Sequence, residues 1–193
     1  MDEAWHAVAE RLRHEAGDED AAEFERLRDE RDLDALARVL TEPDRPLWAR
    51  EFAALRLGRA GDHRAFEALV LLLNHRDPER CSAAAHALAR LGDPRTARAA
   101  AALATNELRV AYALHPVRLL TELRAPESAP ALITVLERRL ASPADPYWRV
   151  ALACVEGLGA LADPRAAPAL TAARAHPRLA PAATAALARI APT

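Results

Sequence analysis

A short phrase recurs along the 193-residue chain at nearly constant spacing, and it constrains the fold more than any other feature. In its fullest form it reads Leu-Gly-Asp-Pro-Arg and follows an alanine-rich stretch. The position usually held by aspartate falls at residues 32, 62, 93, 125 and 163, so successive copies are 30, 31, 32 and 38 residues apart. This period matches a unit of two short helices and two turns, which must stack on its neighbours to bury a core.

Each part of the phrase has a role at a helix boundary. Gly61 and Gly92 can adopt the left-handed conformation that ends a helix. The aspartate that follows is a good N-cap because its carboxylate accepts free backbone N–H groups, and the next proline suits the first helical position. We expect each turn arginine to pair with a turn aspartate of a neighbouring unit rather than to form an anion-binding stripe. The residues with these predicted structural roles are Asp62, Asp93, Asp163, Arg64, Arg95 and Arg165.

Between the turns the apolar spacing is helical. Phe66, Leu69, Val70 and Leu73, for example, follow the i, i+3, i+4, i+7 pattern, whereas no useful period-2 segment occurs. We predict an all-α chain, a right-handed α-solenoid of helix pairs. About twelve helices are expected, at 2–16, 19–30, 33–41, 46–59, 63–74, 78–90, 94–105, 107–124, 127–140, 146–160, 164–175 and 179–190.

The repeated phrase after an alanine-rich helix resembles the HEAT-like repeats of phycobilin lyases. The resemblance covers roughly residues 32–190. It implies a solenoid whose second helices line a concave face and whose terminal helices are caps. We therefore expect one continuous solenoid domain. Residues 1–44 would form an acidic N-terminal cap with a first degenerate repeat, and residues 45–193 the regular repeats with a capping C-terminal helix.

Charge is divided unevenly along the chain. Residues 1–44 hold fifteen acidic residues and six arginines, a net charge of −9, whereas residues 45–193 hold thirteen acidic residues and twenty arginines, a net charge of +7. The acidic segment fits a solvated cap. The basic remainder leaves open an anionic ligand or a nucleic acid as partner, although the overall charge of −2 weighs against nucleic acid.

The unit at 106–145 departs most from the repeat. Ala125 replaces the turn aspartate, Glu127 replaces the turn arginine, and Pro116 is expected to kink the predicted helix 107–124. Aromatic side chains beside arginines are typical of protein-binding hot spots. The candidate partner-binding residues, including one from the preceding unit, are Arg98, Tyr112, His115, Arg118, Arg138, Arg139, Tyr147 and Arg149. The alternative is that the irregularity is only structural, and Trp48 and Trp148 are predicted to fill seams between repeats.

The sequence contains no recognisable catalytic centre. Phosphate-binding loops and nucleophile elbows are missing, and the seven histidines are scattered. The chain is therefore predicted not to be an enzyme, without catalytic residues, metal or cofactor. The expected function is a protein-interaction scaffold or adaptor that binds a macromolecule on its concave face. One alternative is an anionic-ligand or nucleic-acid binder. Another is a relative of the HEAT-like alkylpurine DNA glycosylases, which need tryptophans, arginines and an acidic residue; the candidates here would be Trp48, Trp148, Arg149 and Glu156.

The start of the chain lacks the basic and apolar regions of a signal peptide, and the longest apolar run, 68–73, is too short to span a bilayer. Cys81 and Cys154 lie far apart in alanine-rich stretches, which predicts buried, reduced thiols. These features predict a cytoplasmic protein without membrane contact. The bacterial type and the protein partner are expected from the repeat scaffold instead.

Overall fold

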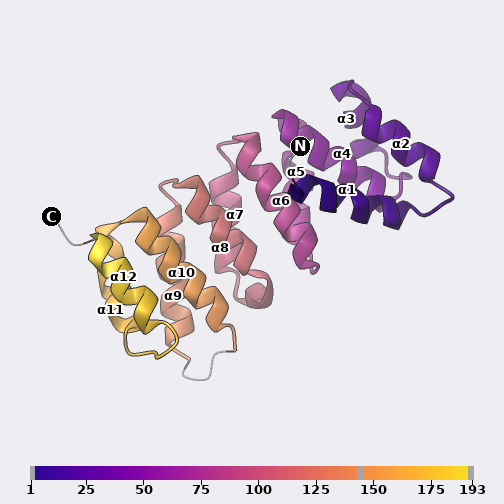
Figure 1. The fold of residues 1–193 in the computed structure, drawn as a ribbon. Coiled ribbons are helices and arrows are strands. Elements are labelled where there is room, and N and C mark those ends of the chain that lie inside the picture. The colour runs from indigo at the N-terminus through magenta and orange to yellow at the C-terminus, as the bar shows by residue number, and fades with distance from the viewer. Residues whose placement is uncertain (1–2, 143–145, 191–193) are drawn as a thin grey trace. The chain divides into compact units, whose positions relative to one another are not determined.

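The computed structural model describes residues 3–142 and 146–190 (Figure 1). Over these residues the chain is helical and contains no β-strand, so the all-α prediction is confirmed. The α-helices are α1 (Glu3–Ala16), α2 (Ala21–Asp29), α3 (Leu33–Thr41), α4 (Leu47–Ala60), α5 (Phe66–Leu73), α6 (Pro78–Leu91), α7 (Thr96–Thr105), α8 (Leu114–Leu123), α9 (Ser128–Leu140), α10 (Trp148–Leu161), α11 (Ala167–Ala173) and α12 (Ala180–Ile190). Three 3₁₀ helices are η1 (His63–Ala65), η2 (Glu107–Tyr112) and η3 (Pro164–Ala166).

Four of the helix starts in the described residues carry an aspartate cap. The side chains of Asp32, Asp62, Asp77 and Asp163 each accept a hydrogen bond from the backbone N–H two residues later. Two of these caps open a 3₁₀ turn that runs into the α-helix rather than opening the α-helix directly. The carboxylate of Asp93 is buried, and its Oδ2 lies 2.9 Å from Nδ1 of His63.

The helix ends also follow the repeated phrase. Gly61 and Gly92 take the left-handed conformation after α4 and α6, with φ of 78° and 67°. The equivalent positions after α8 and α10 are held by Arg124 and Ala162, which adopt the same conformation at φ of 51° and 54°. A side chain at positive φ costs free energy that glycine avoids, so the later turns are more strained than the earlier ones.

The helices form two compact units, residues 1–93 and 94–193. Unit 1 contains α1 to α6, with α4 packed against α3, α5 and α6. Helices α1 and α2 also pack on α4. The predicted division after residue 44 falls inside this unit, between the neighbouring helices α3 and α4.

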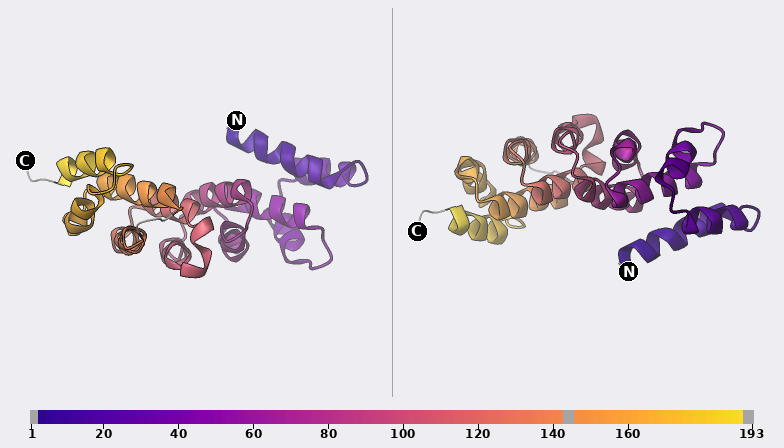
Figure 2. Two further views of the ribbon diagram at one scale, coloured as in Figure 1. Left: turned by 90° about the horizontal axis from the view of Figure 1, so that it is seen from below. Right: turned by 90° about the horizontal axis from the view of Figure 1, so that it is seen from above.

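Unit 2 contains α7 to α12 in two layers. Helix α10 packs against α8 and α12 in one layer, whereas α9 packs against α7 and α11 in the other (Figure 2). The layers are joined by pairs such as α9 with α10 and α11 with α12. Both units therefore consist of stacked helix pairs.

The predicted helix 107–124 is wrong as a single element. The chain forms η2, leaves helical geometry at Arg109 (φ −128°, ψ 22°), and begins α8 only at Leu114. Pro116 is consequently in the first turn of α8, where a missing N–H disrupts no continuous ladder. The expected mid-helix kink at this proline is therefore also wrong.

Candidate functional site

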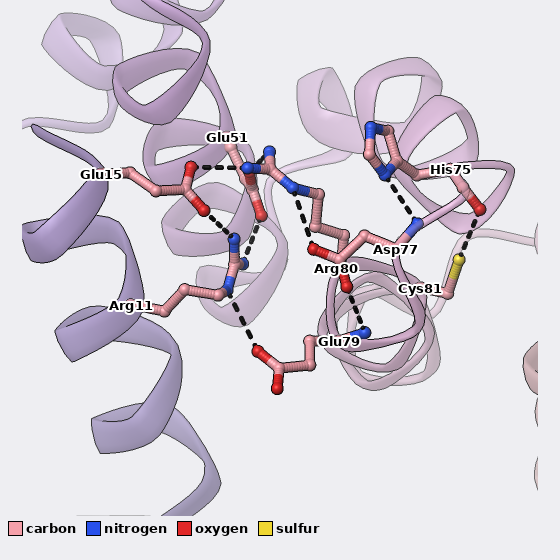
Figure 3. A network of polar contacts seen from close by, with 8 residues as sticks. All are labelled: Arg11, Glu15, Glu51, His75, Asp77, Glu79, Arg80 and Cys81. Carbon is pink, nitrogen blue, oxygen red and sulfur yellow. Dashed lines mark hydrogen bonds and ion pairs between the residues drawn. The ribbon is translucent and has the colours of Figure 1, made fainter.

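In unit 1, four ionised side chains from three helices form a ring (Figure 3). Glu51 of α4 is only 2% exposed. Its Oε1 accepts a hydrogen bond of 2.6 Å from Arg11 of α1, and its Oε2 accepts one from Arg80 of α6. Glu15 closes the ring, accepting from Arg11 at 2.8 Å and from Arg80 at 2.5 Å.

The contacts within this ring stabilise the charged form of Arg11. Burial acts to lower the pKa of Arg11, but its hydrogen bond and attraction to Glu51 outweigh burial and raise that pKa above its ordinary value. Each carboxylate thus faces two guanidinium groups. We assign the ring to holding α1 against α4 and α6. Sequence reasoning missed it, because Glu15 and Arg80 are 65 positions apart.

A groove of about 410 Å³ lies in unit 1 between the end of α3, the start of α4 and the outer side of α5. Its floor includes Ala54 and Leu72, and its rim includes Leu47 and Leu71, which are 51% and 72% exposed. Arg50 also lines it, and the Nε of this arginine is buried without an acceptor in the described part of the chain. The groove therefore combines exposed apolar side chains with an incompletely satisfied cation.

A second hollow of unit 1, of about 770 Å³, separates α1 from α2. Trp5 lines it and packs against Phe52, with ring centroids 5.6 Å apart, while the guanidinium of Arg59 lies 4.9 Å from the Trp5 ring. Its walls contain both acidic and basic side chains, including Glu10 and Arg13. Such a mixed lining favours no particular ligand class.

The structure does not unite the sequence-predicted partner-binding residues. Arg138 is exposed and turns toward the α7–η2 segment, where it donates to the Thr105 carbonyl at 2.7 Å and lies 3.2 Å from Glu107. Its neighbour Arg139 is half-buried, shares a small hollow with Arg138, and also lines the cavity beside Trp148. Tyr112 is half-buried under the guanidinium of Arg109, at 5.0 Å.

The other predicted residues are distributed over separate elements. Arg98 lies exposed on α7 and Arg118 exposed on α8. His115 is half-buried in the first turn of α8. Tyr147 is 38% exposed immediately before α10, followed along the chain by the exposed Arg149.

The cavity beside Arg139 has a volume of about 490 Å³. Arg139 and Leu140 of α9, Trp148 and Ala151 of α10, and the turn before α12 line it. The turn contributes His176 and Arg178, which sequence reasoning missed because they follow the last repeated phrase and match no motif.

The two tryptophans predicted to fill seams behave differently. Trp48 is 5% exposed, packs 6.0 Å from Phe24 and donates its indole N–H to Asp20 at 3.2 Å, as a structural side chain should. Trp148 is half-buried and lines the unit 2 cavity. It is therefore available to a ligand in a way that Trp48 is not.

The turn arginines follow the predicted pairing only in part. Arg64 binds its own Asp62 and reaches Asp34 of the preceding repeat at 2.8 Å. Arg165 instead pairs with Asp163 of its own turn, at 2.6 Å. Among the described residues, a pair between successive turns is thus present at Arg64, with Asp34 rather than the turn aspartate Asp32, whereas Arg165 pairs within its own turn.

Both cysteines are buried thiols, as predicted, and burial raises the pKa of the Cys154 thiol. Within residues 3–142 and 146–190, no group of three or more histidine, cysteine or acidic side chains has the arrangement of a metal site. None of the helices in these ranges combines the length and the apolar character needed to cross a membrane.

Comparison with known proteins gives a likeness to a solved structure. No protein-family model matches the chain, and no curated protein matches it. Among solved structures, the complex of CpcE and CpcF of phycocyanin lyase from Nostoc sp. PCC7120 is similar, with a TM-score of 0.59 and 25% sequence identity. The alignment covers 83% of this chain and 65% of that chain, slightly less than two thirds of its length.

This likeness corrects one prediction. The sequence predicts that the chain is not an enzyme, but the similar structure is that of a lyase, so that prediction is contradicted. The prediction was weak because the repeated phrase specifies only helix caps and turns. The same helical scaffold can carry a catalytic site or a binding site. The predicted architecture is confirmed: the chain has the HEAT-like helical-repeat fold that is found in phycocyanin lyase.

Proposed function

We propose that this chain is a protein-binding repeat protein and that the unit 1 groove beside α5 receives its partner. The observation that carries the proposal is the pair of exposed leucines, Leu47 and Leu71, on the rim of one groove. Large apolar side chains gathered around a concavity mark interaction sites, whereas scattered ones do not. A protein partner also agrees with the similar structure, which is a complex of two proteins.

The groove specifies the chemistry of its occupant. An apolar helix face would cover Leu47 and Leu71, as in other helix-in-groove complexes. A carboxylate on that helix would satisfy the buried Nε of Arg50. We therefore propose an amphipathic helical segment of another protein, with at least one acidic residue beside its apolar face.

The partner can be identified by photo-crosslinking from position 67, since Glu67 is exposed and lines the groove. The purified partner is then titrated against the wild type and against the double variant Leu47→Ser/Leu71→Ser. We expect the variant to lose at least about 2 kcal/mol of binding free energy, the range of an interface hot spot. Leu108→Ser is the matched control, because Leu108 is 95% exposed in η2, outside the groove lining.

The sequence-predicted residues of unit 2 remain a proposed second surface. The double variant Arg138→Glu/Arg139→Glu tests it in the same titration. Loss of partner affinity in this variant, with full affinity in Leu47→Ser/Leu71→Ser, would reject the groove in favour of that surface.

Lyase activity is a second candidate function, favoured by the likeness to phycocyanin lyase. The chain aligns with only 65% of the similar chain, so this activity too is a proposal. It can be assayed by incubating the protein with phycocyanin and following its absorbance spectrum. An unchanged spectrum, in the presence of the identified partner, would argue against it.

A further inference from the structure

We propose that the unit 1 groove fixes the direction of the helix that it binds. The N-terminus of the partner helix lies beside Glu67, and its C-terminus lies beside Arg50. This polarity rests on the proposed protein-binding function of the groove and adds the chemical order of the bound segment. It follows from the charged side chains of the lining, which differ between the two ends of the groove.

The packing of α4 against α5 places the two ends. A short turn and η1 join these helices, and Gly58 near the end of α4 lies beside Leu69 of α5. Toward the other end of α4, Glu51 binds Arg80, which follows the end of α5 along the chain. The two helices therefore run in opposite directions, so the start of α4 lies beside the end of α5.

The groove consequently has one end at the start of α5 and one at its finish. Glu67 is in the first turn of α5 and marks the first end. Arg50 is in the first turn of α4 and His75 follows α5, so both belong to the second end. The ion pair of Arg64 with Asp34, at 2.8 Å, joins the start of α3 to the Glu67 end.

Most of the charge in the lining is compensated within unit 1. The charged or titratable side chains that line the groove are Arg50, Glu51, Arg64, Glu67 and His75. Glu51 belongs to the ion ring, and Arg64 pairs with Asp62 and Asp34. Arg50 and Glu67 form no ion pair within the described residues. One uncompensated charge of each sign is thus present, at opposite ends.

The Arg50 end offers hydrogen-bond donors. The Nε of Arg50 is buried and has no acceptor in the described part of the chain. Nδ1 of His75 accepts a hydrogen bond of 3.0 Å from the backbone N–H of Asp77, so the neutral imidazole carries its proton on Nε2. The C-terminus of a helix has unpaired carbonyl groups and a partial negative charge, and it therefore fits this end.

The Glu67 end offers an exposed carboxylate. The N-terminus of a helix has unpaired N–H groups and a partial positive charge, so it fits here. Helix α5 has eight residues and is about 12 Å long, which matches about two turns of a partner helix. We therefore expect a basic residue on the partner, followed about two turns later by an acidic residue, with apolar residues between them.

The test compares two synthetic peptides of identical composition on the full chain by fluorescence anisotropy. Both have a leucine face, and a hydrocarbon staple on the opposite face keeps both helical. The first peptide has lysine in its first turn and glutamate about two turns later, whereas the second has these two residues exchanged. We expect the first to bind about tenfold more tightly, because the exchange makes two attractive contacts repulsive.

Variants at each end of the groove test the cause of this preference. Glu67→Arg is the principal variant, because Glu67 is exposed and its replacement leaves the core unchanged. It should reduce the preference to about twofold or less. Arg50→Gln should weaken binding of the first peptide more than that of the second. Arg76→Glu is the matched control, since Arg76 is exposed beside His75 but does not line the groove, and it should preserve the preference.

Cross-linking measures the direction itself. A photoreactive residue at the N-terminus of the first peptide should attach near Glu67 and Ala68, and one at its C-terminus near Leu47 and His75. The reverse pattern would overturn the proposed direction even if the affinities agreed with it.

The leucine variant separates failure of the polarity from failure of the groove. Equal binding of the two peptides, or tighter binding of the second, would overturn the polarity if Leu47→Ser/Leu71→Ser abolishes that binding. The groove would then remain a binding site. If neither peptide binds the wild type, or if binding survives in the leucine variant, the groove is rejected as the binding site and the polarity with it.

Discussion

The two units share the same turn phrase but hold their helices together by different means. Unit 1 has aromatic contacts, such as Phe24 with Phe52 at 5.2 Å, and the ion ring around Glu51. Unit 2 has an interior of alanine, leucine and valine, in which Thr121 lies close to Gly157 and Ala186 lies close to Gly159. The charges differ as well: unit 1 has 21 acidic residues and 14 arginines, unit 2 has seven and twelve.

The comparison separates two kinds of information in a repeat. The turn phrase determines where helices begin and end, because capping is a local interaction. The contacts between helices depend on residues that the phrase does not include. Unit 1 depends on a few specific long-range contacts, whereas unit 2 depends on close packing of small residues. Different substitutions should therefore destabilise the two units.

The largest effect is expected from Glu51→Ala in unit 1. Removing this carboxylate leaves Arg11 and Arg80 partly uncompensated beneath α1, and breaking a buried ion pair costs about 3–5 kcal/mol. Urea unfolding followed by tryptophan fluorescence measures the loss, since Trp5 and Trp48 both report on unit 1. Glu79→Ala is the control, because the Glu79 side chain is 77% exposed and lies 3.9 Å from Arg11. Similar losses in both variants would show that the ring has no special role.

Gly159→Ala should destabilise unit 2 by about 1–3 kcal/mol, the usual cost of overpacking. A Cβ at this position would lie 2.9 Å from the Cα of Ala186, and backbone cannot easily move away. Gly58→Ala in unit 1 is the counterpart. Its Cβ would meet the flexible end of Leu69 at 2.7 Å, so we expect a smaller loss. Thermal unfolding of both variants compares the units, and a larger loss at Gly58 would reverse the proposed difference in packing.

The helix-terminating turns should respond in opposite directions. Ala162→Gly relieves a positive φ in unit 2 and should raise the free energy of unfolding by about 0.5–1 kcal/mol, whereas Gly61→Ala in unit 1 should lower it by a similar amount. Arg124→Gly should gain less, because Arg124 also donates to the Ala160 carbonyl at 3.1 Å. Chemical denaturation of the three variants gives the order, and a loss of stability in Ala162→Gly would contradict the strain argument.

The smallest expected effect is on the stability of the fold at low pH. Hydrogen bonding to Arg64 lowers the pKa of Asp62 below its ordinary value of 3.8, and hydrogen bonding to Arg165 does the same for Asp163. A folded-state pKa below the unfolded one adds stability above pH 3.8, and that stability is lost as the pH falls through the folded pKa. Asp163→Asn keeps a capping side chain but removes the charge. The melting temperature should therefore differ between wild type and variant near neutral pH and converge in strong acid, below the folded pKa, and a constant difference would disprove the charge effect.

Much of the fold could be predicted because its signals are local. The predicted helix at 33–41 has the observed bounds, and that at 78–90 differs by one residue at its end. The failure at 107–124 has a local cause too, because Arg109 leaves helical geometry although no glycine or proline marks that position.

The candidate sites are less predictable because they depend on residues brought together from distant positions. The sequence predicts Arg139 as a site residue, but its cavity neighbours His176 and Arg178 lie almost 40 positions later. Arg138 and Arg139 are adjacent in sequence and line one small hollow, but only Arg139 also reaches the cavity beside Trp148. The groove at Leu47 and Leu71 escapes prediction because exposure of a leucine cannot be read from helical spacing when both faces of the helix are apolar.

The ion ring has a consequence for the order of events during synthesis. Arg11 and Glu15 leave the ribosome well before their partner Arg80, which follows 65 residues after Glu15. Until α6 has been made, α1 lacks part of its charge partners, and closure of so long a loop is slow compared with helix formation. Helix α1, although synthesised before the rest of unit 1, should therefore be among the last of its helices to dock, leaving its Trp5 face uncovered for chaperones in the meantime.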